Sequence, residues 1–140
     1  MTTSTLIDTN ILIDLLSPAD AATRPWSLAQ LKRCTTEGPV VLSAIVWAEL
    51  ADPRFREFEL AQAFAWLQPR RENFPYAAAW PAGEAHRLYR RRGGQRERTL
   101  PDFLIGAHAA VAGHRLLTRD AARYRAYFPD LTIICPETHP

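Results

Sequence analysis

The sequence has few of the residues that mark several large classes of protein. Its two cysteines, Cys34 and Cys135, lie far apart and form no CxxC or other metal-binding spacing. No apolar run is long enough to span a bilayer, and the N-terminus has no cationic stretch followed by an apolar one. We therefore expect no membrane segment, no disulfide framework and two buried thiols in a reducing, cytoplasmic compartment.

Several catalytic signatures are also missing. No GxGxxG or Walker A loop is present to cradle a nucleotide, and no serine or cysteine stands in a nucleophile elbow. A phosphate-receiver domain relies on a lysine near a late strand, whereas the one lysine here is Lys32, early in the chain. A haloacid-dehalogenase-type phosphatase needs a second aspartate two residues after its nucleophile, but Asp8 is followed by Thr9 and Asn10. These types of site are therefore disfavoured.

The residues that are present are typical of a globular α/β protein. The 140 residues are 47% hydrophobic and 23% charged, which fits a single domain over residues 1–140. Short apolar strands alternating with helices predict parallel βαβ units, and hence a three-layer α/β/α sandwich with a central, mostly parallel sheet. We expect strands at 6–7, 40–43, 115–118 and 131–135, and helices at 10–16, 25–36, 47–50, 57–67, 76–91, 101–113 and 120–128.

Acidic residues stand where the expected strands end and the next helices begin. The first strand runs into Asp8, although burying a carboxylate without partners is costly. Glu49 lies in the helix after the second strand, and Asp102 begins the helix before the third. Asp120 follows that third strand by two residues. Because these junctions share one edge of a parallel sheet, we expect the four carboxylates to converge on one site.

Each of these acids also has a purely structural interpretation. Asp8 can cap the helix that follows it, and Asp102 can complete a capping box with Thr99. Asp120 can complement the dipole of its helix, and Glu49 can be a solvated helix residue. The argument for a site is the joint placement of one acid at each of four strand–helix junctions.

Four ionised carboxylates in one cleft require protons or cations. Two like charges ~4 Å apart repel by about 4 kcal/mol at an effective dielectric of about 20. Oxygen ligands favour Mg²⁺ or Mn²⁺ over zinc. We interpret His108, on the helix that begins near Asp102, as a packing or supporting residue rather than a ligand of this site. A metal held by carboxylates activates water for phosphoryl displacement, so we expect hydrolysis of a polyanionic substrate.

Arginine is concentrated in one segment of a nearly neutral chain of net charge +2. The stretch RLYRRRGGQRER, residues 87–98, holds six of the seventeen cationic residues and one acid. Arg90, Arg91 and Arg92, beside two glycines, suit an arm that contacts a phosphate backbone or a partner protein. A solvated loop at a helix end is the alternative interpretation.

Four motifs in order give the chain a family resemblance: LIDTNILIDLL, LSAIVWAEL, LPDFLIGAHA and LLTRDAARY. Together they resemble the PIN-domain nucleases, and most closely the VapC-type ribonuclease toxins of bacterial toxin–antitoxin pairs. The resemblance runs from Thr5 to about Ile134. It implies an endoribonuclease dependent on Mg²⁺ or Mn²⁺, forming a homodimer, with an acidic cleft that a cognate antitoxin covers.

The resemblance also implies roles for individual residues. Asp8 and Asp102 would be direct metal ligands, and Asp120 would complete the metal pocket. Glu49 would hold the metal or orient its water.

Further residues would support or modify this site. Thr118 would support it by hydrogen bonding, and Asn10 would order the loop after the first strand. Arg123 stands where some relatives place another acid, which implies a weaker second metal and a resting site with one metal. Two alternatives stay open: a PIN nuclease of RNA processing or DNA repair without an antitoxin, and a non-catalytic module that docks a partner. The presence of all four acids disfavours the second.

Overall fold

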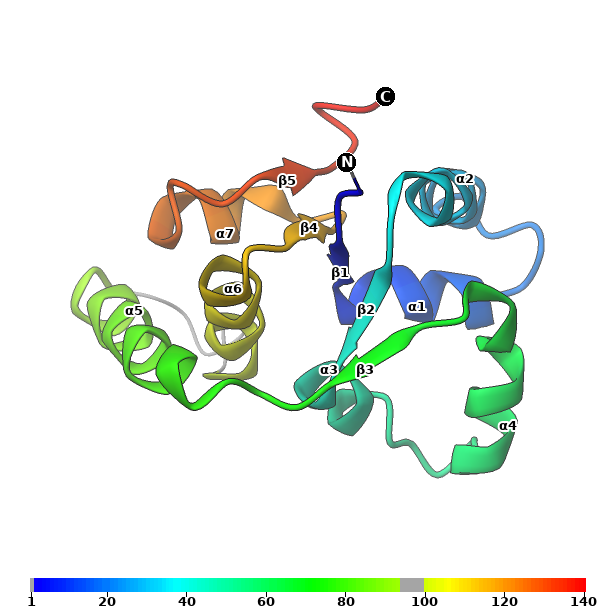
Figure 1. Ribbon diagram of the computed structural model, residues 1–140, viewed down its shortest axis with the longest axis horizontal. Coiled ribbons are helices and arrows are strands. Elements are labelled where there is room, and N and C mark those ends of the chain that lie inside the picture. The colour runs from blue at the N-terminus through cyan, green and yellow to red at the C-terminus, as the bar shows by residue number, and fades with distance from the viewer. Residues whose placement is uncertain (1, 94–99) are drawn as a thin grey trace.

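The computed structural model, which describes residues 2–93 and 100–140, is built around a central β-sheet (Figure 1). The sheet has five strands in the order β3-β2-β1-β4-β5. Every strand pairing within the described residues is parallel. The strands are β1 (Thr5–Ile7), β2 (Val40–Ser43), β3 (Arg70–Glu72), β4 (Arg115–Leu117) and β5 (Ile133–Ile134). The predicted α/β sandwich with a parallel sheet is therefore confirmed.

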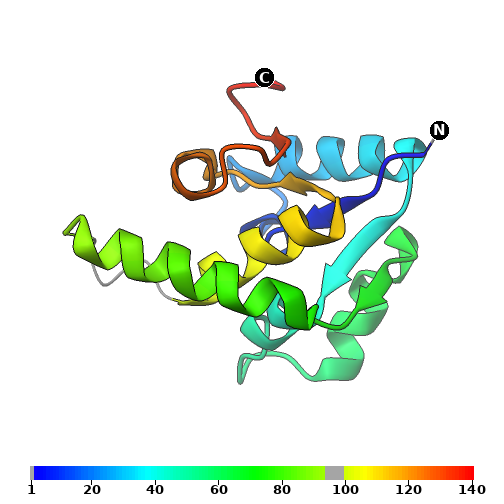
Figure 2. The same cartoon turned by 60° about the vertical axis from the view of Figure 1, so that its left-hand side comes forward.

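Helices cover both faces of this sheet. The helices α2 and α4 lie on one side and α5, α6 and α7 on the other (Figure 1). Figure 2 shows α5 running along the outside of α6. The α-helices are α1 (Thr9–Leu16), α2 (Arg24–Glu37), α3 (Ala44–Glu49), α4 (Glu57–Ala63), α5 (Ala79–Arg91), α6 (Leu100–Ala112) and α7 (Ala121–Tyr127), and two 3₁₀ turns are η1 (Ala65–Leu67) and η2 (Tyr76–Ala78).

The direction in which the chain adds strands reverses at β1. From β1 the chain proceeds to β2 and β3 on one side, and then crosses to β4 and β5 on the other. Open α/β sheets bind ligands at the carboxyl ends of the two strands that flank such a reversal. Asp8 directly follows β1 and Thr118 directly follows β4, so the fold brings these two side chains to that point.

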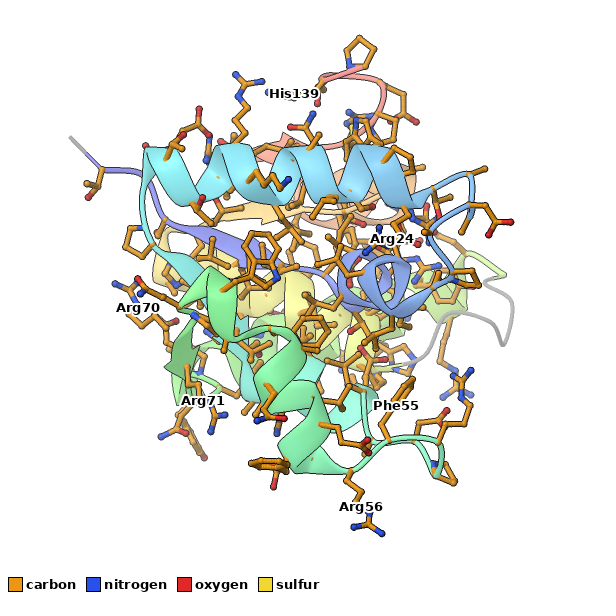
Figure 3. The ribbon with its side chains drawn as sticks, turned by 90° about the vertical axis from the view of Figure 1, so that its right-hand side faces the viewer. Arg24, Phe55, Arg56, Arg70, Arg71 and His139 are labelled. Atoms are coloured by element: carbon orange, nitrogen blue, oxygen red, sulfur yellow. The ribbon has the colours of Figure 1, made fainter. Side chains whose placement is uncertain are left out.

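The structure differs from the sequence-based prediction around β3. The helix predicted over residues 57–67 is wrong at its end: α4 ends at Ala63, and η1 and a left-handed Gln68 follow it. The strand β3 was not predicted, because its residues are charged and partly or fully exposed. Arg70 and Arg71 project from this sheet edge (Figure 3). Charged side chains on an edge strand hinder pairing with another chain, which explains a strand without an apolar pattern.

The positions of Pro81 and of the two cysteines agree with the sequence-based expectations. Pro81 falls in the first turn of α5, where the missing N–H would have no partner within the helix. Cys34 and Cys135 are both free and buried. Within the described residues, no helix is both long and apolar enough to cross a membrane. The C-terminal tail lies against α2, where the indole of Trp26 donates a hydrogen bond of 2.6 Å to the carbonyl of His139 (Figure 3).

Candidate active site

Asp8 is a buried carboxylate with several hydrogen-bond donors around it. Only 5% of the residue is exposed. Its Oδ1 accepts from the backbone N–H of Thr9 at 2.8 Å, so Asp8 is also the N-cap of α1. Its Oδ2 accepts from the hydroxyl groups of Thr118 at 2.7 Å and of Tyr124 at 2.9 Å. The carboxylate that ends β1 is thus held by residues that follow β4.

Burial controls the protonation of this pair. It raises the pKa of Asp8 from 3.8 to about 6, while hydrogen bonds from Thr118, Tyr124 and Thr9 oppose the rise and the charge of Asp102 adds to it. Burial, together with the charges of Asp8 and Asp102, also raises the pKa of Tyr124 well above its usual value. Tyr124 therefore keeps its proton and donates a hydrogen bond to Asp8. A carboxylate that ionises this reluctantly gains from a nearby cation.

Arg123 lies between two of the predicted acids. Its Nη1 is 2.7 Å from Oδ2 of Asp102, and its Nη2 is 2.9 Å from Oδ2 of Asp120. The side chain of Arg123 is 21% exposed, and its buried Nε has no hydrogen-bond partner in the described part of the chain. Burial opposes its charge, but the nearby charges, led by those of Asp102 and Asp120, and the hydrogen bond to Asp102 together raise the pKa of Arg123. One fixed positive charge therefore already offsets part of the negative charge of two carboxylates.

Thr118 joins the segments that follow β1 and β4. Its hydroxyl donates to Asp8 and accepts from the backbone N–H of Asp120 at 3.0 Å. The amide of Asn10 donates to the same hydroxyl at 3.3 Å, and its oxygen accepts from the backbone N–H of Arg119 at 3.4 Å. Asn10 and Thr118 thus have the supporting positions that the sequence predicts, and their functional roles stay predictions.

Glu49 reaches the same region from a different element. It is the last residue of α3 and is exposed. Its Oε1 accepts a hydrogen bond of 2.6 Å from the hydroxyl of Thr9, which directly follows Asp8. Contacts therefore connect the four predicted acids indirectly. Asp102 and Asp120 share Arg123, Asp8 is within electrostatic reach of Asp102, and Glu49 binds the hydroxyl of Thr9, the residue after Asp8.

The arginine segment lies at the far end of α5, and its second half falls outside the described residues. Arg90, Arg91 and Arg92 are exposed, and the guanidinium of Arg92 lies over the ring of Tyr127 at 5.6 Å. The predicted cap at Thr99 and the remaining arginines of residues 94–99 lie outside the described residues. The proposed binding role of this segment therefore stays a prediction.

Sequence reasoning missed a second buried carboxylate behind the site. Asp14, 3% exposed, accepts from the hydroxyl groups of Ser27 at 2.5 Å and Thr23 at 3.0 Å. Its Oδ2 also accepts from Nε of Arg119 at 2.5 Å. This network fixes the residue between Thr118 and Asp120 against α1 and α2. The signal was present in the sequence as a second aspartate inside an apolar helix.

The donor atoms at the site fit a hard divalent cation. They are carboxylate oxygens, and Oδ1 of Asp8 accepts no hydrogen bond beyond that from Thr9 among the described residues. Arg123 already occupies one side of Asp102. This arrangement fits one ion near Asp8 and Asp102 better than two.

Fold and site together define an α/β/α domain with an acidic cluster where the strand order reverses. Residues 5–129 match the PIN domain model, and the chain belongs to the PIN-domain family. The family prediction made from the four motifs is therefore confirmed. No curated protein matches the chain in sequence.

Solved structures with a similar fold include several toxin–antitoxin complexes. VapBC2 of Rickettsia felis, bound to a DNA fragment from its promoter, matches with a TM-score of 0.72 and 18% identity, covering 95% of this chain and 98% of that one. VapBC-1 of nontypeable Haemophilus influenzae matches with a TM-score of 0.69 and 18% identity, covering 95% of this chain and 98% of that one. A toxin–antitoxin complex of Klebsiella pneumoniae matches with a TM-score of 0.65 and 25% identity, covering 93% of this chain and 95% of that one. These similarities show a shared fold over nearly the whole of both chains.

Proposed function

We propose that this PIN domain is an endoribonuclease dependent on Mg²⁺ or Mn²⁺ and acts as the toxin of a VapC-type toxin–antitoxin pair. One observation supports the proposal: Asp8, which ends β1, is within electrostatic reach of Asp102, Asp102 and Asp120 share Arg123, and Glu49 binds the hydroxyl of Thr9 next to Asp8. Such an all-oxygen cluster in an α/β sheet suits hydrolysis of a phosphodiester, in which water is the nucleophile.

Asp8 and Asp102 would hold the ion, and Asp120 would complete the pocket. When bound, Mg²⁺ or Mn²⁺ supplies a Lewis acid for a phosphodiester oxygen and lowers the pKa of the attacking water. Glu49 is exposed and fixed by Thr9, so its carboxylate would orient that water. Donors on both of its oxygens hold the carboxylate of Asp8 in place, so it would be oriented in advance for the cation.

Arg123 would contribute a permanent charge to the site. Its guanidinium neutralises part of Asp102 and Asp120 before any ion binds. A polyanionic substrate therefore meets a cleft that is less negative than four free carboxylates would make it. This supports a site that works with one divalent ion and one arginine.

A cognate antitoxin is the proposed partner, together with a second copy of the chain. The VapBC complexes with the same fold support an antitoxin. Large apolar side chains near the start of α5 also suit coverage by a partner, since Tyr76 is 95% and Trp80 is 73% exposed.

Cleavage of RNA by the purified full-length protein tests the proposal. Asp8→Asn and Asp102→Asn should each abolish cleavage that depends on Mg²⁺ or Mn²⁺, because each removes a charge from the proposed ion site. Asp20→Asn, at an exposed position outside the site, is the matched control and should cleave like the wild type. Cleavage at the wild-type rate by either site variant would show that the site is wrongly assigned.

Expression in bacteria separates the toxin from the other activities. The wild type should arrest growth, and co-expression of the protein encoded beside it should restore growth. RNA cleavage without growth arrest would favour an RNA-processing nuclease. Preferred cleavage of DNA would favour a repair enzyme, and partner binding without any cleavage would favour a docking module.

A further inference from the structure

A second group of metal-binding side chains lies outside the acidic site. Glu72 ends the edge strand β3, His108 belongs to α6, and His114 stands between α6 and β4. Nε2 of His108 is 3.0 Å and Nε2 of His114 is 2.8 Å from the same oxygen, Oε1 of Glu72. The three ligand atoms all lie within 4.8 Å of one another. Three separate elements thus direct two imidazoles and one carboxylate at a single point.

Both imidazoles are buried, and each is hydrogen-bonded through its second ring nitrogen. The side chain of His108 is 0% exposed and that of His114 is 4% exposed. Nδ1 of His108 is 2.9 Å from the hydroxyl of Ser43, and Nδ1 of His114 is 2.6 Å from that of Ser4. Histidines that bind metals usually have their second ring nitrogen fixed in this way by a polar group. A hydroxyl can donate or accept, so each serine permits the tautomer that offers a lone pair at Nε2.

The carboxylate of Glu72 is also oriented. Its Oε2 lies 3.1 Å from Nη2 of Arg70, two residues earlier on β3. This ion pair turns Oε1 toward the two histidines. The site therefore has three aligned ligands, each with a supporting partner on its other polar atom.

The donor set and spacing suit zinc rather than magnesium. Zinc is bound by imidazole nitrogen and carboxylate oxygen at about 2.0–2.2 Å, so tetrahedral ligands lie about 3.3–3.5 Å apart. The contacts of 2.8 Å and 3.0 Å need to widen by only a few tenths of an ångström to admit the ion. Imidazole ligands favour zinc-class transition metals, whereas the acidic site offers oxygen alone.

The carboxylate of this cluster is partly accessible to solvent. The side chain of Glu72 is 26% exposed. Glu72 and Ser43 line a surface hollow of about 210 Å³, together with Trp47, Arg71 and Asn73 among others. Of the three proposed ligands, Glu72 lines this hollow, so an ion would approach the cluster from the side of Glu72.

We propose that Glu72, His108 and His114 form a zinc site that fastens the edge strand β3 to α6 and to the start of β4. The site is independent of the proposed nuclease centre, since none of its residues belongs to that centre. Its role is structural: β3 has only three residues, none of them buried, so apolar packing alone holds it weakly. An ion shared by three elements supplies the missing attachment.

Zinc binding by the full-length, metal-free protein tests this proposal. The protein is dialysed against Zn²⁺ and the bound metal is measured by elemental analysis. The wild type should bind one zinc ion per chain. Glu72→Gln and His114→Asn should each weaken that binding by about 100-fold or more, because each replaces a ligand. His139→Asn, outside the cluster, is the matched control and should bind like the wild type.

Asp8→Asn distinguishes the two metal sites. It should retain the zinc ion while losing metal-dependent RNA cleavage, so failure of this proposal is separable from failure of the nuclease assignment. Zinc that is lost in Asp8→Asn would place the ion in the acidic site and overturn the proposal. Wild-type binding no stronger than that of Glu72→Gln would overturn it too, and would leave the three residues as a hydrogen-bond network only.

Thermal unfolding and Co²⁺ absorption provide readouts that do not depend on activity. Zinc should raise the melting temperature of the wild type and of Asp8→Asn but not that of Glu72→Gln. Co²⁺ should give the visible bands of a four-coordinate nitrogen and oxygen site in the wild type and lose them in His114→Asn. Circular dichroism confirms that each variant is folded; if Glu72→Gln does not fold, His114→Asn decides the outcome. Equal responses of the wild type and of the folded ligand variant would overturn the proposal.

Discussion

The hydroxyl of Tyr124 donates a hydrogen bond of 2.9 Å to Oδ2 of Asp8, so a helix that follows β4 holds the carboxylate that ends β1. The two residues are separated by most of the chain, and both are buried. Asp8 is therefore positioned by the tertiary structure as well as by its capping of α1.

Replacing Tyr124 by phenylalanine tests this relationship. Hydrogen bonds to charged groups contribute about 1.5–3 kcal/mol, and Tyr124→Phe should lower the free energy of unfolding at pH 7 by that amount. Because this hydrogen bond lowers the pKa of Asp8, its loss should raise that pKa further, which carboxyl-carbon NMR measures. Tyr127→Phe, on the same helix, is the control and should change neither quantity. A Tyr124→Phe variant with unchanged stability and pKa would show that the hydrogen bond does not form in solution.

Asp8 gives the metal-free protein a distinctive dependence of stability on pH. Its pKa is raised from 3.8 to about 6, so the folded state binds the proton more tightly than the unfolded state does. The stabilising contribution of Asp8 to the free energy of unfolding is therefore fully present below about pH 4. It is lost as the pH rises through about 6, and the total change is about 3 kcal/mol. Urea unfolding at several pH values should show this decline superimposed on the other titrations.

Two comparisons isolate the part due to Asp8. Asp8→Asn should lack this decline, because it has no group to titrate. Saturating Mg²⁺ should reverse the trend in the wild type, because the ion binds the ionised carboxylate and competes with the proton. The same slope in Asp8→Asn as in the wild type would mean that another group is responsible.

Arg123 should compete electrostatically with the divalent ion. Arg123→Gln removes the positive charge that lies 2.7 Å from Asp102 and 2.9 Å from Asp120. We expect Mg²⁺ affinity, measured by titration calorimetry, to rise about tenfold. Stability without metal should fall, because the two carboxylates lose their shared partner. Arg125→Gln makes the same change of charge on α7 but does not contact Asp102 or Asp120, so its affinity for Mg²⁺ should equal that of the wild type. Equal Mg²⁺ affinities in the wild type and both variants would refute the competition.

The arginines at the end of α5 should contribute to binding of a polyanion. Neutralising Arg90, Arg91 and Arg92 together should weaken binding of RNA or of the antitoxin. It should also reduce the dependence of log K on log[salt], by a slope of about 0.7 for each phosphate of single-stranded RNA that the variant no longer neutralises. A triple variant of Lys32, Arg33 and Arg56 matches the change in net charge. If both triple variants show the wild-type salt slope with both partners, the segment is a solvated helix end.

Much of the fold could be predicted because buried parallel strands appear in the sequence as short apolar runs that alternate with helices. Val40 to Ser43 and Arg115 to Leu117 are short strands followed by helices, and acids at their ends indicate the edge where a site forms. Asp8, Glu49, Asp102 and Asp120 were predicted to converge on these grounds, and the structure connects them through Thr9 and Arg123, while their role as one metal site stays a prediction.

The features that the sequence did not reveal depend on contacts between distant elements. The edge strand β3 has no apolar pattern, because its three residues are charged and none of them is buried. Tyr124 resembles any buried aromatic residue until its hydroxyl is seen beside Asp8. His108 was interpreted as a packing residue, and only the fold shows that it shares Oε1 of Glu72 with His114. Such pairings depend on side-chain direction, which spacing along the chain does not determine.

The position of β1 in the sheet has a consequence for synthesis of the protein. β1 is synthesised before β4, one of its two neighbours in the sheet, and more than 100 residues separate the two strands along the chain. Until β4 is synthesised, β1 has an open edge, and Asp8 lacks both Thr118 and Tyr124. A nascent or truncated chain that lacks these residues therefore has no assembled acidic site, and the proposed activity can begin only after Tyr124 has been synthesised.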